Sequence, residues 1–233
     1  MDPDELARLM NDYFQAAVSG CIHPTDGTVV RYIGDAIFAF WNAPEPQPDH
    51  AVRACEAALR FREQGKEKVR GIKLVTRIGL HTGVANVGNF GSETHVDYTA
   101  IGESVNLAAR LESLNKYLGT SVLISGATKQ EIGNHISTRY MGRFRLKGFE
   151  NSVEVYEIIG GSSTANPSSN DDFACGLEAF RRRDFIAAQS AFSRALEAKP
   201  QDGPANFYSR HVTQLMGQKL PDNWKGEVEL KEK

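Results

Sequence analysis

Residues 28–44, TVVRYIGDAIFAFWNAP, carry the pattern that decides the fold, because one carboxylate, Asp35, interrupts two apolar runs. β-branched and aromatic residues fill 28–33 and 36–41, and such residues favour strands. Gly34 and Asp35 form the short connection that joins the strands of a hairpin. The pattern therefore predicts a β-hairpin with an acid at its tip. Asp35 either completes this turn, which is common chemistry for Gly-Asp, or faces a group that needs its charge.

The rest of the chain before residue 160 alternates between helical and strand patterns. We expect helices at 3–19, 49–64, 103–115 and 128–132, and strands at 72–80, 84–88, 121–125, 140–147 and 153–158. Neighbouring strands are close enough to form hairpins, and one such hairpin is expected around His81-Thr82-Gly83. This order predicts an α+β sandwich of the ferredoxin-like kind, not a doubly wound sheet.

Composition excludes several classes of protein. The chain has 233 residues and a net charge of −2, so no basic excess points to nucleic acid or to an anionic membrane surface. The three cysteines form no CxxC pair, which argues against a disulfide framework or a zinc site and fits a reducing compartment. No apolar run reaches the roughly 18 residues of a membrane span, and the N-terminus lacks a signal-peptide pattern. We expect a cytoplasmic protein.

One boundary divides the chain. Residues 160–170, GGSSTANPSSN, are small and polar and predict a flexible linker between a domain at 1–159 and a helical appendage at 171–213, followed by a tail at 214–233. Small, aromatic and proline residues in the appendage match the spacing of a tetratricopeptide (TPR) repeat: Gly176, Ala188, Phe192, Ala195 and Pro200. One repeat is weak evidence, because such repeats stabilise one another by stacking. A helical hairpin docked on the first domain or on a partner fits equally well, and both interpretations stay open.

Three segments together resemble a known family: 31–44, 77–116 and 145–158. They resemble the catalytic domain of class III nucleotidyl cyclases, the adenylate and guanylate cyclases, and the motif GESVNLAARLE at 102–112 is highly specific. The resemblance runs from residue 1 to about residue 159. It implies attack of a ribose 3′-hydroxyl on the α-phosphate of the same nucleotide, which yields a 3′,5′-cyclic monophosphate and pyrophosphate.

The resemblance also assigns roles to individual residues. Asp35 matches an aspartate that binds a divalent metal, Mg²⁺ or Mn²⁺, of which the family uses two per site. Asn106 matches a residue that orients the ribose, and Arg110 one that neutralises charge on the α-phosphate. Lys147 matches a lysine that holds the triphosphate as a point charge.

The residues at the base-reading positions are Arg31 and Thr99. Thr99 is similar to the threonine of a bacterial-rich subgroup of adenylate cyclases, some of which respond to bicarbonate. Arg31 departs from the usual lysine, and its forked guanidinium could donate to adenine N1 or to guanine O6 and N7. The glutamate typical of guanylate cyclases is absent from this position. ATP is therefore the expected substrate, with GTP as the alternative.

The family site lies between two subunits, so the resemblance implies a homodimer with two equivalent sites. One feature of the family is missing: the opening strand, with its first metal aspartate, would precede residue 1. Asp2, Asp4 and Asp12 match nothing in that strand's pattern. Either the sequence is a fragment of a working cyclase, or it is a weak or inactive cyclase. In both cases we expect residues 1–233 to be poorly stable and severely impaired in catalysis, since the lost strand belongs in the middle of the sheet.

Two functional hypotheses therefore remain. The first is a cyclase that makes cyclic AMP. The second is a degenerate cyclase domain that binds nucleotide or a partner without turnover and uses the appendage for interaction. Two further features are expected to be structural: His81 beside its turn, and the glycines Gly83, Gly88 and Gly91, which do not fit a phosphate-binding loop.

Overall fold

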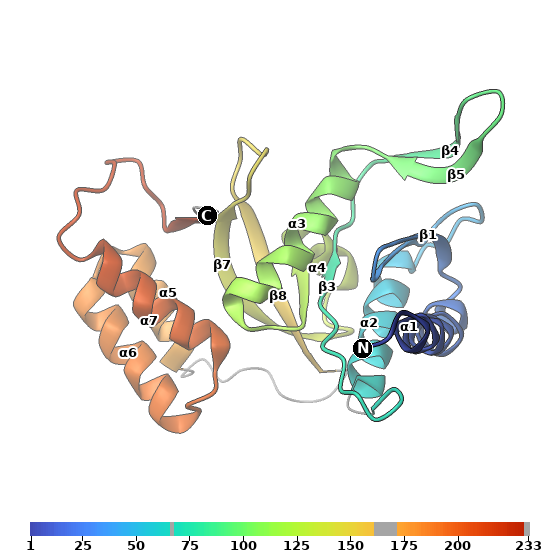
Figure 1. Ribbon diagram of the computed structural model, residues 1–233. Coiled ribbons are helices and arrows are strands. Elements are labelled where there is room, and N and C mark those ends of the chain that lie inside the picture. Colours follow the sequence, from blue (N-terminus) through green and yellow to red (C-terminus); the bar gives the residue numbers. More distant parts are fainter. Residues whose placement is uncertain (66–67, 161–171, 231–233) are drawn as a thin grey trace.

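The computed structural model describes residues 1–65, 68–160 and 172–230, and Figure 1 shows a mixed sheet with helices from both ends of the chain around it. The helices are α1 (Pro3–Ala17), α2 (His50–Gln64), α3 (Glu103–Leu118), α4 (Gly126–Ile132), α5 (Asp172–Arg181), α6 (Phe185–Ala198) and α7 (Gly203–Leu215). A π-helical turn, Val18–Ile22, and a 3-10 turn, His23–Thr25, follow α1. The strands are β1 (Thr28–Ile33), β2 (Ala36–Phe40), β3 (Ile78–Leu80), β4 (Asn86–Gly91), β5 (Val96–Ile101), β6 (Val122–Ser125), β7 (Ser137–Arg145), β8 (Val153–Gly160) and β9 (Glu227–Glu229).

The hairpin predicted from residues 28–44 is confirmed. β1 and β2 pair antiparallel, with Ile33 opposite Ala36, and Asp35 lies in the connection between them. Gly34 has φ +62°, a left-handed conformation that costs glycine little. The α+β class is also confirmed.

The hairpin predicted around His81 is wrong. β3 instead pairs in parallel with β6, and β4 pairs antiparallel with β5 through a turn in which the Ser92 amide donates to the His95 carbonyl at 2.9 Å. The reason is tertiary, because β3 packs directly on α3. A Cβ atom at Gly79 would lie 2.2 Å from the backbone nitrogen of Glu112. This close contact with α3 places β3 beside β6 in the five-stranded sheet. β4 pairs instead with β5, the next strand along the chain.

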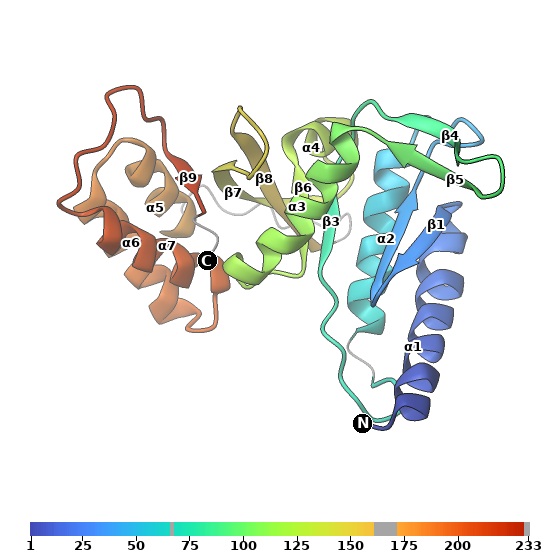
Figure 2. The same cartoon turned by 45° about the horizontal axis from the view of Figure 1, so that its top comes forward.

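The strands form three separate sheets: the β1–β2 hairpin, the β4–β5 hairpin and a five-stranded sheet ordered β3-β6-β8-β7-β9. Within the described ranges, β2 and β3 each pair on one side only. Figure 2 shows the β1–β2 hairpin beside α1 and α2, apart from the five-stranded sheet.

Two buried clusters hold the five-stranded sheet. One lies between α2 and the sheet and includes Cys55, Ile124 and Ile158. The other continues from α3 through β7 and β8 into the C-terminal helices, and includes Leu111, Phe144 and other fully buried side chains: Phe173, Phe192, Tyr208 and Val228. The two clusters bury opposite helical layers against one sheet, so the C-terminal helices share the core of the first domain.

The C-terminal appendage is docked on the sheet. α5 and α6 form the expected helical pair, and a Cβ atom at Gly176 would lie 2.5 Å from the Phe192 ring. The small and aromatic residues of the repeat-like spacing therefore do meet, but the third helix, α7, and the strand β9 pack against β7 and α3. The sequence did not predict β9. The linker predicted at 160–170 lies, apart from Gly160 at the end of β8, outside the described residues.

Candidate functional site

Asp35 lies at the tip of the β1–β2 hairpin. The side chain is exposed, as are its neighbours Gly34 and Ala36. A carboxylate on an exposed turn can reach a hard cation without moving the strands that carry it. The position therefore suits the metal-binding role that the resemblance implies.

Asn106 and Arg110 lie one turn apart on α3. Leu107, Leu111 and Leu114 bury the opposite face of this helix, so Asn106 is exposed and Arg110 half-buried. Gly102, at φ +152°, connects β5 to the start of α3 and so ties the helix to the strand that carries Thr99. One short connection thus fixes two parts of the predicted site relative to each other.

Lys147 is the second residue after the end of β7, in the loop that leads to β8. Leu146 before it is buried in the cluster that also contains Leu107 of α3, and the Phe149 amide donates to the Leu146 carbonyl at 3.1 Å. Gly148 has φ +89°, which turns the chain after the lysine. The exposed Lys147 is therefore anchored by a buried neighbour on the cluster that also supports α3.

Arg31 and Thr99 are brought to the same region by the two hairpins. Arg31 Nη2 lies 3.0 Å from Asp97 Oδ2, and both side chains are almost half exposed. Thr99 is only 7% exposed. Asp97 and Thr99 are two residues apart on β5, so their side chains point to the same face of that strand. The base-reading region of this chain therefore includes a carboxylate as well as the arginine and the threonine.

Sequence reasoning missed Asp97. The signal that could have found it is the period of two along β5, which places residue 97 on the face of residue 99. That signal becomes meaningful only once β5 is seen beside β1. The contact of Phe40 with Tyr98, with ring centroids 6.0 Å apart, marks the same approach of the two hairpins.

The predicted two-ion metal centre is incomplete within the described residues. No group of three or more His, Cys, Asp or Glu side chains gathers there in a way that could hold a metal ion. Mg²⁺ is commonly held by one or two carboxylates together with water and substrate phosphates, so Asp35 can serve as one protein ligand, but a two-ion centre needs a further carboxylate to hold both ions. The residues present thus fit one ligand of such a centre but not the centre itself.

His81 has a structural role, as expected. Its Nδ1 lies 2.8 Å from the Ser125 hydroxyl, and that hydroxyl in turn accepts the Thr128 amide at the start of α4. Burial lowers the pKa of His81, which favours the neutral ring at neutral pH. The imidazole therefore acts as a partner in a helix cap.

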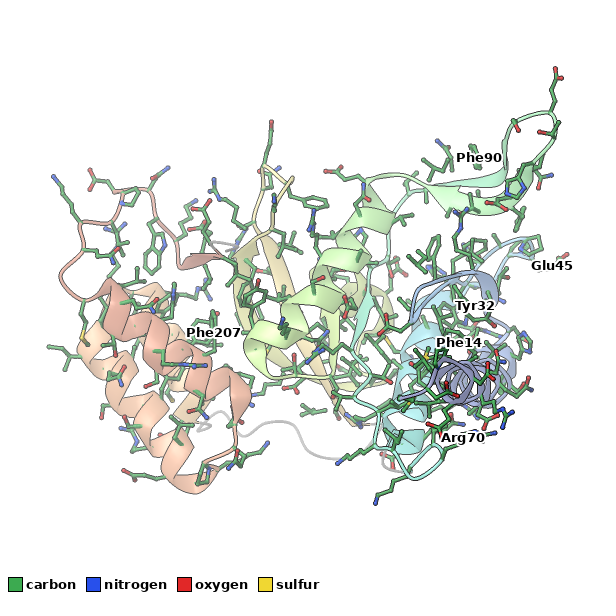
Figure 3. All side chains as sticks on the ribbon, in the orientation of Figure 1. Phe14, Tyr32, Glu45, Arg70, Phe90 and Phe207 are labelled. Carbon is green, nitrogen blue, oxygen red and sulfur yellow. The ribbon has the colours of Figure 1, made fainter. Side chains whose placement is uncertain are left out.

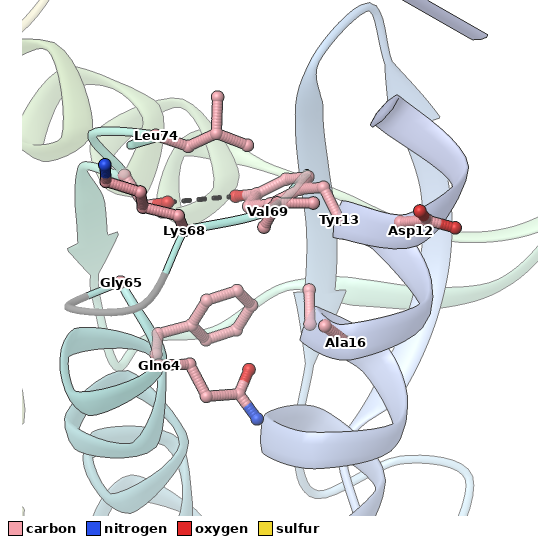
Figure 4. Close-up of a pocket in the computed structure, with 11 residues that line it drawn as sticks. Asp12, Tyr13, Ala16, Gln64, Gly65, Lys68, Val69 and Leu74 are labelled. Carbon is pink, nitrogen blue, oxygen red and sulfur yellow. Dashed lines mark hydrogen bonds between the residues drawn. The ribbon is translucent and has the colours of Figure 1, made fainter. Parts of the chain in front are cut away.

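Two cavities of the molecule lie away from these residues. One, of about 310 Å³, lies between α1, α2 and the segment that follows α2, where Tyr13 bonds Thr76 (Figure 4). The other, of about 570 Å³, lies between α4, β7, β8 and α5. None of the predicted site residues is among the described residues that line either cavity. Those residues lie instead on the two hairpins, on α3 and in the loop after β7.

Comparison with known proteins identifies the family of this chain. The family model described as the adenylate and guanylate cyclase catalytic domain matches residues 1–160. The chain belongs to this family. The cyclase domain is 37% identical over 164 residues to adenylate cyclase 1 of Rhizobium meliloti, an alignment that covers 68% of this chain and 24% of that protein. It is similar in fold to a crystal structure of the guanylate cyclase domain of RhGC from Catenaria anguillulae in complex with GTP. That match has a TM-score of 0.62 and 27% identity, and covers 69% of this chain and 87% of the other.

A further relative extends beyond the cyclase domain. The adenylate cyclase of Dictyostelium discoideum that is specific to terminal differentiation is 28% identical over 225 residues, which covers 91% of this chain and 10% of that protein. The family match ends at residue 160 of 233, so this alignment includes residues of the C-terminal appendage. The chain spans about a quarter of the Rhizobium protein and a tenth of the Dictyostelium protein.

Among the residues that the structure describes, no helix has both the length and the apolar character needed to cross a membrane.

Proposed function

We propose that this cyclase domain converts ATP to 3′,5′-cyclic AMP and pyrophosphate. The observation that carries the proposal is α3 itself, which presents Asn106 and Arg110 on its outer face directly after the strand of Thr99. In the proposed reaction, Asn106 orients the ribose so that its 3′-oxygen faces the α-phosphorus. Arg110 neutralises the charge that develops on the α-phosphate oxygens, and Lys147 holds the leaving pyrophosphate.

The nucleotide base is proposed to be read by Arg31, Asp97 and Thr99 together. A guanidinium held by a carboxylate presents its remaining N–H groups in a fixed direction, which suits the acceptor N1 of adenine. The carboxylate of Asp97 could accept from the exocyclic amino group of adenine, but it could also accept from N1 and N2 of guanine. The proposal of ATP therefore rests on the named adenylate cyclase relatives and on the threonine, and GTP is the competing substrate.

Divalent ions, Mg²⁺ or Mn²⁺, are proposed as cofactors with Asp35 as one ligand. The second carboxylate is proposed to come from a strand that would fit between β2 and β3, each of which pairs on one side only within the described residues. Such a strand would pair with both edges and so join the hairpin to the five-stranded sheet. This would complete the donor set that the described residues leave unfinished.

A homodimer is proposed as the active form. The β4–β5 hairpin projects from the molecule and exposes apolar side chains, among them Phe90 (Figure 3). Val96, Tyr98 and Ile101 on the same hairpin are between 38% and 56% exposed. Exposed apolar residues gathered on one projecting hairpin favour a protein interface. A second copy of the chain would bury them in an interface that carries two equivalent sites.

The test is a cyclase assay with Mn²⁺ or Mg²⁺, in which ATP and GTP are supplied separately. It compares residues 1–233 with a form that also carries a strand and its aspartate ahead of residue 1, and uses Arg110→Ala in the longer form as the inactive control. We expect cyclic AMP from the longer form and little from residues 1–233. Cyclic GTP as the main product would replace ATP with GTP in the proposal. Formation of neither product would overturn it.

A second candidate function is supported by the divided sheet and the incomplete metal centre. In this alternative the domain binds a nucleoside triphosphate through Lys147, Arg110 and the base-reading residues without turning it over. ATP binding by both forms in the absence of any product would favour it over the enzyme.

A further inference from the structure

Strand β7 is contacted by the C-terminal appendage along its whole length, and the first contact is an ion pair near its start. Arg139 Nη1 donates to Asp202 Oδ2 at 2.7 Å, and these side chains are only 14% and 7% exposed. The Arg139 guanidinium also lies 3.8 Å from the centre of the Phe173 ring. A charge pair this well buried is stable only while both partners stay in place, so it fixes the start of α7 against β7.

The second contact lies at a bulge in the middle of β7. The pairing with β8 passes from Tyr140 to Gly142, which leaves Met141 as the extra residue. The fully buried Tyr208 of α7 donates its hydroxyl to the Met141 carbonyl at 2.7 Å. Gly142 has φ +112°, and a Cβ atom there would lie 2.2 Å from the Tyr208 hydroxyl. The bulge at Met141 and the absence of a side chain at Gly142 thus leave room for the Tyr208 side chain of the appendage.

The third contact lies at the end of β7. Strand β9 pairs in parallel with it, placing Val228 opposite Phe144 and Glu229 opposite Arg145. Val228 is fully buried, so this short strand is held by packing as well as by its ladder. β9 covers the outer edge of the five-stranded sheet, at the point where β7 passes into Leu146 and Lys147.

We propose that residues 172–229 form a brace that positions Lys147 for the triphosphate of the substrate. The proposal rests on the proposed function, in which Lys147 binds that triphosphate. An ammonium group on a flexible four-carbon stem acts as a well-placed charge only if its backbone is fixed, because small misplacements of a binding group cost much of its effect. The three contacts fix β7 at its start, at its bulge and at its end, and Lys147 is the second residue beyond that end.

The brace interpretation replaces the expected partner-binding role of the appendage. In a binding module of stacked helical repeats, one face stays available for a ligand. Here Phe173, Phe192 and Tyr208 are in the buried cluster shared with β7, so the face that carries them is occupied by the cyclase domain itself. The expectation of a protein partner for the appendage is therefore not supported by the structure.

Two substitutions test the brace without removing it. Tyr208→Phe removes only the hydroxyl that reaches Met141. Asp202→Asn removes the charge that pairs with Arg139 but keeps an oxygen that can accept the Ala205 amide and cap α7. The matched control is Asp184→Asn, because Asp184 caps α6 in the same way, through the Ala187 amide, and makes no contact with β7 among the described interactions.

The first measurement is hydrogen exchange at the backbone amides of residues 146–149 in the nucleotide-free chain. We expect exchange there to be several-fold faster in Tyr208→Phe and Asp202→Asn than in the wild type, and unchanged in Asp184→Asn. Circular dichroism checks that the helices of both variants are intact. If exchange at residues 146–149 is then unchanged in both, the brace proposal is overturned, independently of whether the proposed function is correct.

The second measurement is ATP affinity in the presence of Mg²⁺, taken in the wild type and in a Lys147→Ala background. Each brace substitution should weaken ATP binding by about three- to tenfold in the wild type and have no effect once Lys147 is removed, because coupled residues are not additive. Equal weakening in both backgrounds would overturn the proposal, since the appendage would then act through general stability. Absence of ATP binding by the wild-type chain would overturn the proposed function and the brace with it.

Discussion

The two ends of the sheet differ in how their outer strands are covered. At the β7 end, β9 closes the edge, and α5, α6 and α7 add a layer whose aromatic side chains are buried. At the other end, β3 and the β1–β2 hairpin each keep an open side within the described residues, and Tyr32 and Ile33 are 49% and 59% exposed. Figure 3 shows Tyr32 near Phe14 of α1, and the two rings are stacked with centroids 4.2 Å apart. The difference teaches that the C-terminal residues of the chain cover one end of its sheet, whereas the other end keeps open sides within the described residues.

The largest expected effect comes from filling the open end. A strand with the family's aspartate, placed ahead of residue 1, should pair with β2 and β3 and satisfy backbone groups that are now unpaired. We expect cyclase activity to rise by at least about a hundredfold over residues 1–233, together with slower amide exchange in β2 and β3. Mass spectrometry of exchange alongside a cyclic nucleotide assay checks both. Protection of β3 equal to that of β8 in residues 1–233 would contradict the contrast between the two ends.

The next largest effect is expected from removal of the cation proposed to stabilise the transition state. In the longer, active form, Arg110→Ala should lower kcat by about a hundred- to a thousandfold, because the developing charge on the α-phosphate loses its main cation. The melting temperature should change little, since Arg110 lies on the outer face of α3. Matched changes at two neighbouring residues of the same helix, the half-buried Glu112→Gln and the exposed Ser113→Ala, should each leave kcat within about twofold. An equally large loss in those controls would point to disruption of the helix.

Truncation of one aromatic residue at each end of the sheet compares how much the two ends contribute to the free energy of unfolding. Phe192→Ala removes a fully buried ring from the appendage and should cost about 3–5 kcal/mol of unfolding free energy. Phe14→Ala removes a half-buried ring from α1 and should cost only about 1 kcal/mol. Urea unfolding followed by circular dichroism measures both. Equal costs would mean that the N-terminal end is as well packed as the C-terminal end.

The ion pair between Arg139 and Asp202, at the start of β7, should make the free energy of unfolding depend on pH. Burial by itself raises the pKa of Asp202, but hydrogen bonds from Arg139 and from the Ala205 amide outweigh it and hold this pKa below the usual 3.8. A carboxyl with a lowered pKa contributes stability above its unfolded value, and this is lost as the pH falls through the folded value. Asp202→Asn should therefore cost roughly 1–3 kcal/mol at pH 7 and progressively less below about pH 4.

The measurement is urea unfolding of both proteins between pH 7 and pH 3. Burial raises the pKa of the nearby Glu157, so its protonation on acidification favours the folded state, with the opposite sign. Because the Asp202 charge adds to that raised pKa, the Glu157 contribution is larger in the wild type than in Asp202→Asn and partly opposes the expected decrease in their stability difference. A stability difference that stays constant down to pH 3 would mean that the Asp202 charge is not what holds α7 on β7.

The smallest effect is expected at the base-reading region. Asp97→Asn removes the charge that holds Arg31, and the ratio of kcat/KM for ATP to that for GTP should change by about tenfold, while the larger of the two values falls only a few-fold. The effect is modest because both side chains are almost half exposed to solvent. His95→Asn, at a residue 3.6 Å from the same carboxylate, is the matched control. An unchanged ratio would remove Asp97 from the proposed base-reading set.

Much of the fold could be predicted because its signals are local. The apolar runs on either side of Gly34 and Asp35 determined the first hairpin, and the helix expected at 103–115 corresponds to α3. The family motif then suggested Asn106 and Arg110 as candidate site residues, since GESVNLAARLE is contiguous in the chain. Those predictions depended on neighbours within a few residues, and such short-range preferences are readable from one sequence.

Tertiary contacts decided the rest. β3 pairs with β6 because Gly79 lets α3 approach its backbone, and no local pattern at residues 78–80 encodes that partner. Asp97 becomes part of the candidate site only when β5 comes beside β1, and residues 227–229 become a strand only because the edge of β7 is there to pair with. The sequence by itself thus determined the family, the first hairpin and the helix that carries the family motif, all of which depend on nearby residues. The choice of strand partners and the use of the appendage as part of the core were decided by the tertiary structure, because both depend on surfaces that exist only after the sheet has formed.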